Sequence, residues 1–96
     1  MDILIVGGGA REHALSWAIS KSPKCNKLYC APGNAGIADI AECINILDND
    51  VSAIVIFAKK NAIDLVVIGP ETPLVLGLVD ALEAENIKAF GPSGNA

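Results

Sequence analysis

The sequence predicts one three-layer α/β domain built on a five-stranded parallel sheet. Short apolar runs alternate with segments of helical periodicity, and those runs are unbroken, as in strands buried on both faces. Glycine and proline gather directly after the runs, which closes each strand. Strands joined through helices favour right-handed crossovers and therefore a parallel sheet. At 96 residues, the chain is expected to form a single domain over 1–96.

Each predicted element has its own signal. The strands share short apolar or β-branched runs and are expected at 2–6, 27–31, 44–46, 64–68 and 88–90, with 44–46 the weakest. The helices share apolar residues at three- and four-residue spacing and are expected at 10–21, 51–62 and 73–86. Asp48 and Asp50 offer N-caps for the second helix, whereas Thr72 can cap a third helix that begins at Pro73. By precedent for such sheets we expect the strand order 3-2-1-4-5.

Composition excludes several classes of function. The net charge is −4 and aromatic residues make up 4% of the chain, which argues against a nucleic-acid partner. No apolar run approaches the roughly 18 residues of a membrane helix, and the amino terminus does not look like a signal peptide. Cys25, Cys30 and Cys43 have no metal-binding or redox spacing, so we expect reduced thiols, a cytoplasmic protein and no metal site.

Glycine and proline gather at one predicted edge of the sheet. The segments that follow the first, second, fourth and fifth strands are 7–9, 31–36, 69–73 and 91–94. These segments lie at the carboxyl ends of the strands, where ligands bind in open α/β sheets. Turns also need glycine and proline without any ligand, but enrichment of four loops on one edge favours a binding site.

The first of these loops is suited to phosphate but not to a dinucleotide. Gly7 and Gly9 fit the G-x-G-x-x-G pattern, yet its third glycine position holds Glu12, and the second strand lacks the ribose-binding acid at its end. Glycine backbone and a helix N-terminus still attract an anion, and Arg11 could add a charge-assisted contact. Glu12 is ambiguous, because a first-turn acid also suits the helix dipole. His13 is more simply a capping or packing residue.

A second candidate is Glu71, which lies between two prolines after the fourth strand. A carboxylate held stiffly at this edge suits recognition of vicinal sugar hydroxyls. The alternative is an ordinary acid in the first turn of a helix, and the residues alone do not separate the two. A phosphate cradle together with a hydroxyl-binding carboxylate would fit a ribose phosphate.

Four motifs carry a family resemblance. In order and spacing, GGGAREHAL (7–15), APGNAG (31–36), IGPETPL (68–74) and FGPS (90–93) resemble the amino-terminal domain of glycinamide ribonucleotide synthetase, also called phosphoribosylamine–glycine ligase. The resemblance covers the whole chain and implies a Rossmann-like pre-ATP-grasp domain. It also implies an enzyme of purine biosynthesis that uses ATP and Mg²⁺ to join glycine to 5-phosphoribosylamine, giving glycinamide ribonucleotide.

The resemblance also implies roles for particular residues. The loops after the first two strands would surround the phosphate end of phosphoribosylamine or glycinamide ribonucleotide, and Glu71 would contact its ribose. The implied substrate-binding residues are Gly8, Gly9, Arg11, Pro32, Gly33, Asn34, Gly36 and Glu71.

The family enzyme is several times longer, so ATP and Mg²⁺ would be bound by domains that this chain lacks. No catalytic residue is expected here, and the chain is expected to be an excised domain, inactive alone, whose natural partners are the remaining domains of the parent enzyme. The alternatives are a stand-alone Rossmann-like module that binds a nucleotide or dinucleotide, and a purely structural or dimerising domain.

Overall fold

The computed structural model describes residues 1–69 and 75–91. It contains one five-stranded sheet in the order β3-β2-β1-β4-β5. Every neighbouring pair is parallel, which confirms the predicted sheet and its order. The strands are β1 (Asp2–Gly7), β2 (Lys27–Pro32), β3 (Glu42–Cys43), β4 (Leu65–Ile68) and β5 (Lys88–Phe90).

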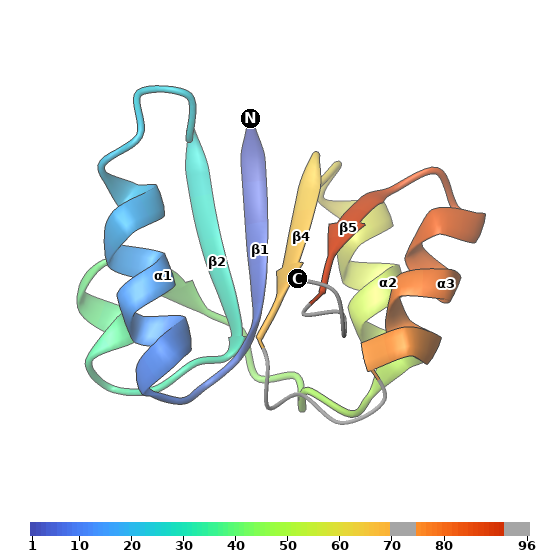
Figure 1. Ribbon diagram of the computed structural model, residues 1–96, viewed down its shortest axis with the longest axis horizontal. Coiled ribbons are helices and arrows are strands. Elements are labelled where there is room, and N and C mark those ends of the chain that lie inside the picture. The colour runs from blue at the N-terminus through green and yellow to red at the C-terminus, as the bar shows by residue number, and fades with distance from the viewer. Residues whose placement is uncertain (70–74, 92–96) are drawn as a thin grey trace.

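Helices cover both faces of the sheet. They are α1 (Ala10–Ser20), α2 (Val51–Lys60) and α3 (Val75–Ala84), with a short 3-10 helix at Ile37–Asp39. Figure 1 shows α1 on one side of the sheet and α2 and α3 on the other, so the three-layer prediction is confirmed. None of the described helices is long and apolar enough to cross a bilayer.

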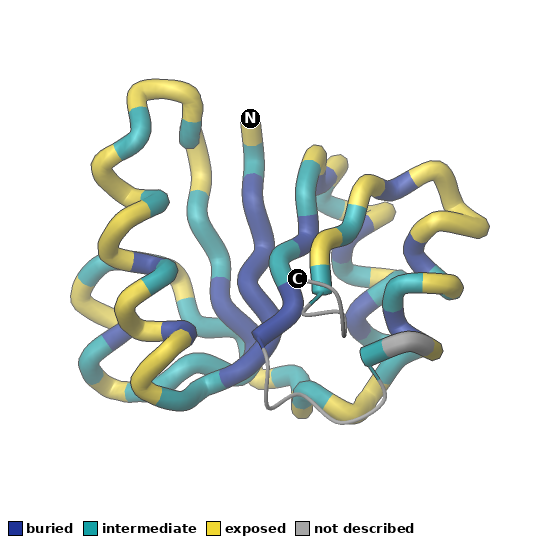
Figure 2. The backbone as a smooth tube through the Cα atoms, in the orientation of Figure 1, coloured by how far each residue is buried: buried dark blue, intermediate teal, exposed yellow. Residues whose placement is uncertain are grey.

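The central strand β1 contributes side chains to two apolar cores, one on each face of the sheet. Ile3 and Ile5 point to the face covered by α1, where Leu15 and Ile19 pack against them. Leu4, on the opposite face, belongs to the core beneath α2 and α3. Because successive side chains of a strand alternate between faces, burial on both faces requires the unbroken apolar run seen in the sequence. Figure 2 shows this buried strand at the centre of the molecule.

The predicted position of the third strand was wrong. It was predicted at 44–46, but only Glu42 and Cys43 pair with β2. The N–H of Ile44 still donates to the carbonyl of Cys30 at 2.8 Å. Beyond it the backbone bends, and the N–H of Ile46 donates to the carbonyl of Ile44 at 2.7 Å. The apolar residues of 44–46 therefore pack against the core from a bend rather than from a strand.

The helix boundaries follow local capping chemistry. Asp50, rather than Asp48, is the N-cap of α2, and its Oδ1 accepts a hydrogen bond of 3.2 Å from the N–H of Ala53. The helix ends two residues before the predicted 62, because Ala62 adopts a left-handed conformation with φ 51°. Thr72 and Pro73, the predicted start of the third helix, lie outside the described residues.

Candidate functional site at the carboxyl edge of the sheet

The loops that follow β1 and β2 lie against each other at the carboxyl edge. The N–H of Gly33 donates to the carbonyl of Gly7 at 3.1 Å. Next to it, Asn34 Nδ2 donates to the carbonyl of Gly8 at 2.8 Å. A methyl group added at Gly8 would stand 2.7 Å from the carbonyl oxygen of Gly33, so the contact requires glycine. The structure therefore brings together two loops that are more than 20 residues apart in the sequence.

The second loop is held in shape by its own residues. Asn34 Oδ1 accepts a 2.9 Å hydrogen bond from the N–H of Ile37, so both ends of this amide side chain are occupied. Gly33 has φ +73°, a conformation that residues with a Cβ rarely adopt. Gly36 lies against the ring of His13, so that a methyl group added at Gly36 would stand 2.7 Å from His13 Cε1. Pro32 pairs with Gly7 at the end of the sheet.

Two thiols lie beneath the same loops. Cys30 Sγ donates to the carbonyl of Gly7 at 3.2 Å, and Cys43 Sγ donates to the carbonyl of Asn34 at 3.5 Å. Burial, followed by the proximity of Cys43, raises the pKa of the Cys30 thiol to about 12. Cys25 is also a free thiol, so none of the three cysteines forms a disulfide within the described residues.

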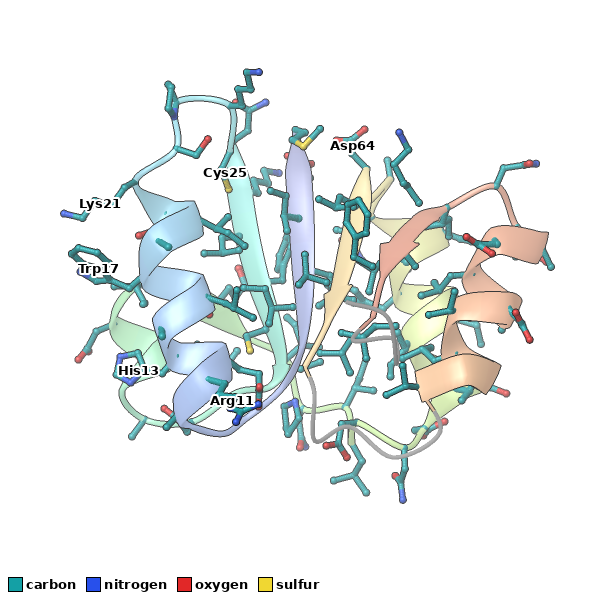
Figure 3. The ribbon with its side chains drawn as sticks, viewed as in Figure 1. Arg11, His13, Trp17, Lys21, Cys25 and Asp64 are labelled. Carbon is teal, nitrogen blue, oxygen red and sulfur yellow. The ribbon has the colours of Figure 1, made fainter. Side chains whose placement is uncertain are left out.

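Arg11 lies in the first turn of α1 with its side chain exposed at the carboxyl edge (Figure 3). No ion pair joins it to another residue of the described ranges. His13 and Trp17 follow on the outer surface of the same helix, and the Lys21 ammonium stands 5.0 Å from the centre of the Trp17 ring.

The structure buries Glu12, whose role the sequence left ambiguous, at this edge of the sheet. This residue is only 4% exposed. Its Oε1 accepts a 2.8 Å hydrogen bond from the N–H of Gly9, as in the half of a capping box that a glycine N-cap can form. A buried oxygen, Oε2, has no hydrogen-bond partner among the residues that the structure describes. The spacing of Gly9 and Glu12 was the available signal, since a residue three positions after an N-cap can reach back to it.

Two glycines make room for the Glu12 side chain. A methyl group at Gly7, the last residue of β1, would stand 2.6 Å from Glu12 Cγ. A methyl group at Gly69, directly after β4, would stand 2.5 Å from Glu12 Oε2. Because β1 and β4 are neighbours in the sheet, the carboxylate lies between the carboxyl ends of these two strands. This is the topological switch point, where crossover connections leave in opposite directions.

These contacts also argue against a dinucleotide. A buried carboxylate occupies the position at which the dinucleotide fingerprint requires its third glycine, and it already uses the Gly9 N–H. A pyrophosphate at this helix N-terminus would meet that charge.

Several predicted features cannot be placed. Glu71 and residues 92–94 of the last glycine-rich segment lie outside the described residues. Within the described part of the chain, no group of three or more His, Cys, Asp and Glu side chains could hold a metal ion.

The fold is that of a Rossmann-like α/β domain, and its carboxyl edge brings together the loops that follow β1 and β2. All 96 residues match the family described as phosphoribosylglycinamide synthetase, N domain, and the chain belongs to this family. It is 55% identical over 93 residues to a phosphoribosylamine–glycine ligase of Brucella melitensis, which covers 97% of this chain and 22% of that protein. It is 50% identical over 96 residues to the ligase of the same name from Caldanaerobacter subterraneus, covering all of this chain and 23% of that protein. The chain thus spans less than a quarter of the length of these relatives, and the resemblance predicted from the four motifs is confirmed.

Proposed function

We propose that this chain is the substrate-holding amino-terminal domain of a phosphoribosylamine–glycine ligase, an enzyme of purine biosynthesis. Such an enzyme joins glycine to 5-phosphoribosylamine and gives glycinamide ribonucleotide. The observation that carries this proposal is the contact between the Gly8 and Gly33 loops beside the switch point, next to the first turn of α1 that carries Arg11. The relatives that bear the name of this ligase support the choice of substrate.

In the proposed complex, the phosphate end of the substrate lies over the loop after β1. Arg11 supplies a charge-assisted contact, and Gly8 and Gly9 let the phosphate approach the backbone. Because the Gly9 N–H already donates to Glu12, Gly9 contributes close approach rather than a free amide. Residues Pro32, Gly33, Asn34 and Gly36 form the neighbouring wall, and Glu71 accepts hydrogen bonds from the ribose hydroxyls.

ATP and Mg²⁺ belong to the same proposal but not to these residues. The described part of the chain offers no acidic cluster for a metal. We therefore assign no step of the ligation to this chain and expect it to be inactive alone, with the nucleotide held by the remaining domains of a longer protein. The free thiols are in keeping with a reducing compartment such as the cytoplasm.

The test is a kinetic comparison in the intact protein that contains this chain. Phosphoribosylamine is generated from ribose 5-phosphate and ammonia, and both glycinamide ribonucleotide and ADP are measured. Loss of a charge-assisted phosphate contact in Arg11→Ala should raise KM for phosphoribosylamine about tenfold or more, with little change in KM for glycine. Lys24→Ala, which removes an exposed cation at the opposite edge, is the matched control.

The same assay includes Glu71→Gln, which should weaken phosphoribosylamine use without affecting folding. Unchanged kinetics in both Arg11→Ala and Glu71→Gln would exclude the assigned substrate contacts. A wild-type protein that forms no glycinamide ribonucleotide would exclude the function itself. Tight binding of NAD, without binding of ribose phosphates, would instead favour a dinucleotide module.

A further inference from the structure

The carboxylate of Glu12 has more acceptor capacity than the fold uses. Oε1 caps the Gly9 N–H, whereas Oε2 is buried without a partner among the described residues. Leaving a buried acceptor unpaired costs stability, and the cost is greater for a charged group. A glutamine could cap Gly9 equally well through its amide oxygen, with an NH2 group in place of Oε2, so the cap does not require a carboxylate. Capping therefore accounts for Oε1, but Oε2 needs another explanation.

The position of the unpaired oxygen suggests that explanation. Oε2 lies at the N-terminus of α1, close to Gly69 at the carboxyl end of β4. Ligands of open α/β sheets bind at this switch point, and a helix N-terminus faces them. The residues beside the carboxylate are Gly7, Gly9 and Gly69, whose backbone can approach or shift without moving a side chain.

We propose that Glu12 is a further substrate-binding residue, whose Oε2 accepts a hydrogen bond from an O–H or N–H group on the sugar of the bound ribose phosphate. This inference rests on the proposed function and adds a contact to the same site. Binding requires a small backbone shift at the neighbouring glycines to expose the oxygen. The bound sugar then supplies the donor that Oε2 lacks in the free protein.

With this contact, Glu12 would favour a sugar phosphate over inorganic phosphate. A sugar phosphate brings sugar O–H donors to the carboxylate, whereas inorganic phosphate brings only the charged group, without a sugar to reach Oε2, to a loop that already contains a buried acid. Removing the charge while keeping the cap should therefore have opposite effects on the two ligands. A purely structural Glu12 would change both affinities together or neither of them.

The experiment compares Glu12→Gln with wild type in the full chain. Dissociation constants for ribose 5-phosphate and for inorganic phosphate are measured by NMR titration. We expect the variant to bind ribose 5-phosphate about tenfold more weakly or worse, and inorganic phosphate as well as or better than wild type. Glu83→Gln, which removes an exposed acid on α3, is the matched control and should change neither constant.

The fold of the variant is checked separately. Its urea midpoint should match that of wild type, because the Gln amide oxygen can still accept from the Gly9 N–H. If the variant does not fold, the ¹³C resonance of the Glu12 carboxyl group in wild type gives the answer. It should shift with ribose 5-phosphate and remain nearly unchanged with inorganic phosphate.

The inference would be overturned if Glu12→Gln weakened the binding of both ligands equally or changed neither. It would also be overturned by a wild-type carboxyl resonance that does not respond to ribose 5-phosphate. No change with either ligand would mean that water satisfies Oε2. A chain that does not bind ribose 5-phosphate overturns this inference, whereas the proposed function fails separately, if the intact protein makes no glycinamide ribonucleotide.

Discussion

The packing of Gly69 against Glu12 gives a quantitative prediction for Gly69→Ala. The added methyl group would stand 2.5 Å from Glu12 Oε2 and 2.6 Å from Cδ, well inside van der Waals contact. Glu12 is nearly fully buried, so it can move away only by straining its rotamer and breaking its 2.8 Å hydrogen bond with Gly9. The broken bond costs about 1.5–3 kcal/mol, and the strained rotamer costs about 0.5–1.5 kcal/mol. An alanine in place of glycine returns about 0.4–1 kcal/mol through the unfolded state.

The expected net loss in the free energy of unfolding is therefore about 1–4 kcal/mol for Gly69→Ala. Urea unfolding of a double-mutant cycle with Glu12→Ala isolates the cause. Without the carboxylate, Gly69→Ala should be neutral or slightly stabilising, which gives a coupling energy of about 2 kcal/mol or more. Gly77→Ala is the matched control, because a methyl group there meets no atom within 4 Å. Additivity of Gly69→Ala and Glu12→Ala to within about 0.5 kcal/mol would refute the contact.

Two further predictions concern the stability of the fold. Asp50→Ala should lower the free energy of unfolding by about 1 kcal/mol, because the N–H of Ala53 loses its acceptor. Asp48→Ala is the control in the same urea titration. Equal losses of stability in the two variants would contradict the assignment of Asp50 as the cap. Burial raises the pKa of Cys30 from 9.0 to about 12, so between these values the folded thiol keeps a proton that the unfolded thiol has lost. Stability should therefore fall as pH rises through this window, by up to about 1.4 kcal/mol per pH unit. In urea titrations at about pH 8 and about pH 10.5, Cys30→Ala should show a smaller fall than wild type, and an identical fall would count against the buried thiol.

The sequence predicted the central strands well because their signal is physical and local. A strand buried on both faces must be apolar at successive positions, and the runs 3–6 and 65–68 within the predicted strands show this pattern. The edge strand β3 lacked such a signal. Its pairing residues, Glu42 and Cys43, are ordinary in sequence, and the more apolar 44–46 packs against the core without pairing. Only the position of the neighbouring strand β2 decides which of these residues complete the ladder.

For the candidate site, the sequence predicted the meeting of the loops but not the burial of Glu12. Topology alone places loops after parallel strands on one edge, so the meeting of the Gly8 and Asn34 segments followed from the predicted order. The burial of Glu12 did not follow, because a first-turn acid satisfies the helix dipole whether it is buried or exposed. Its contact with Gly69 depends on β4 lying beside β1, more than 50 residues later in the chain. The role of Glu71 stays a prediction.

The glycines of the carboxyl edge serve two different needs that look alike in sequence. Gly7 and Gly69 leave space for the side chain of Glu12, whereas Gly8 and Gly33 allow two loops to touch. In the phosphate-cradle interpretation, every such glycine offers backbone to a ligand. Here one amide of the cradle, the Gly9 N–H, is already bonded to the protein's own carboxylate. When an acid follows a glycine-rich loop at the capping-box position, fewer backbone N–H groups are available to a phosphate than the glycines suggest. In this domain the same acid occupies the position at which a dinucleotide site would require a glycine.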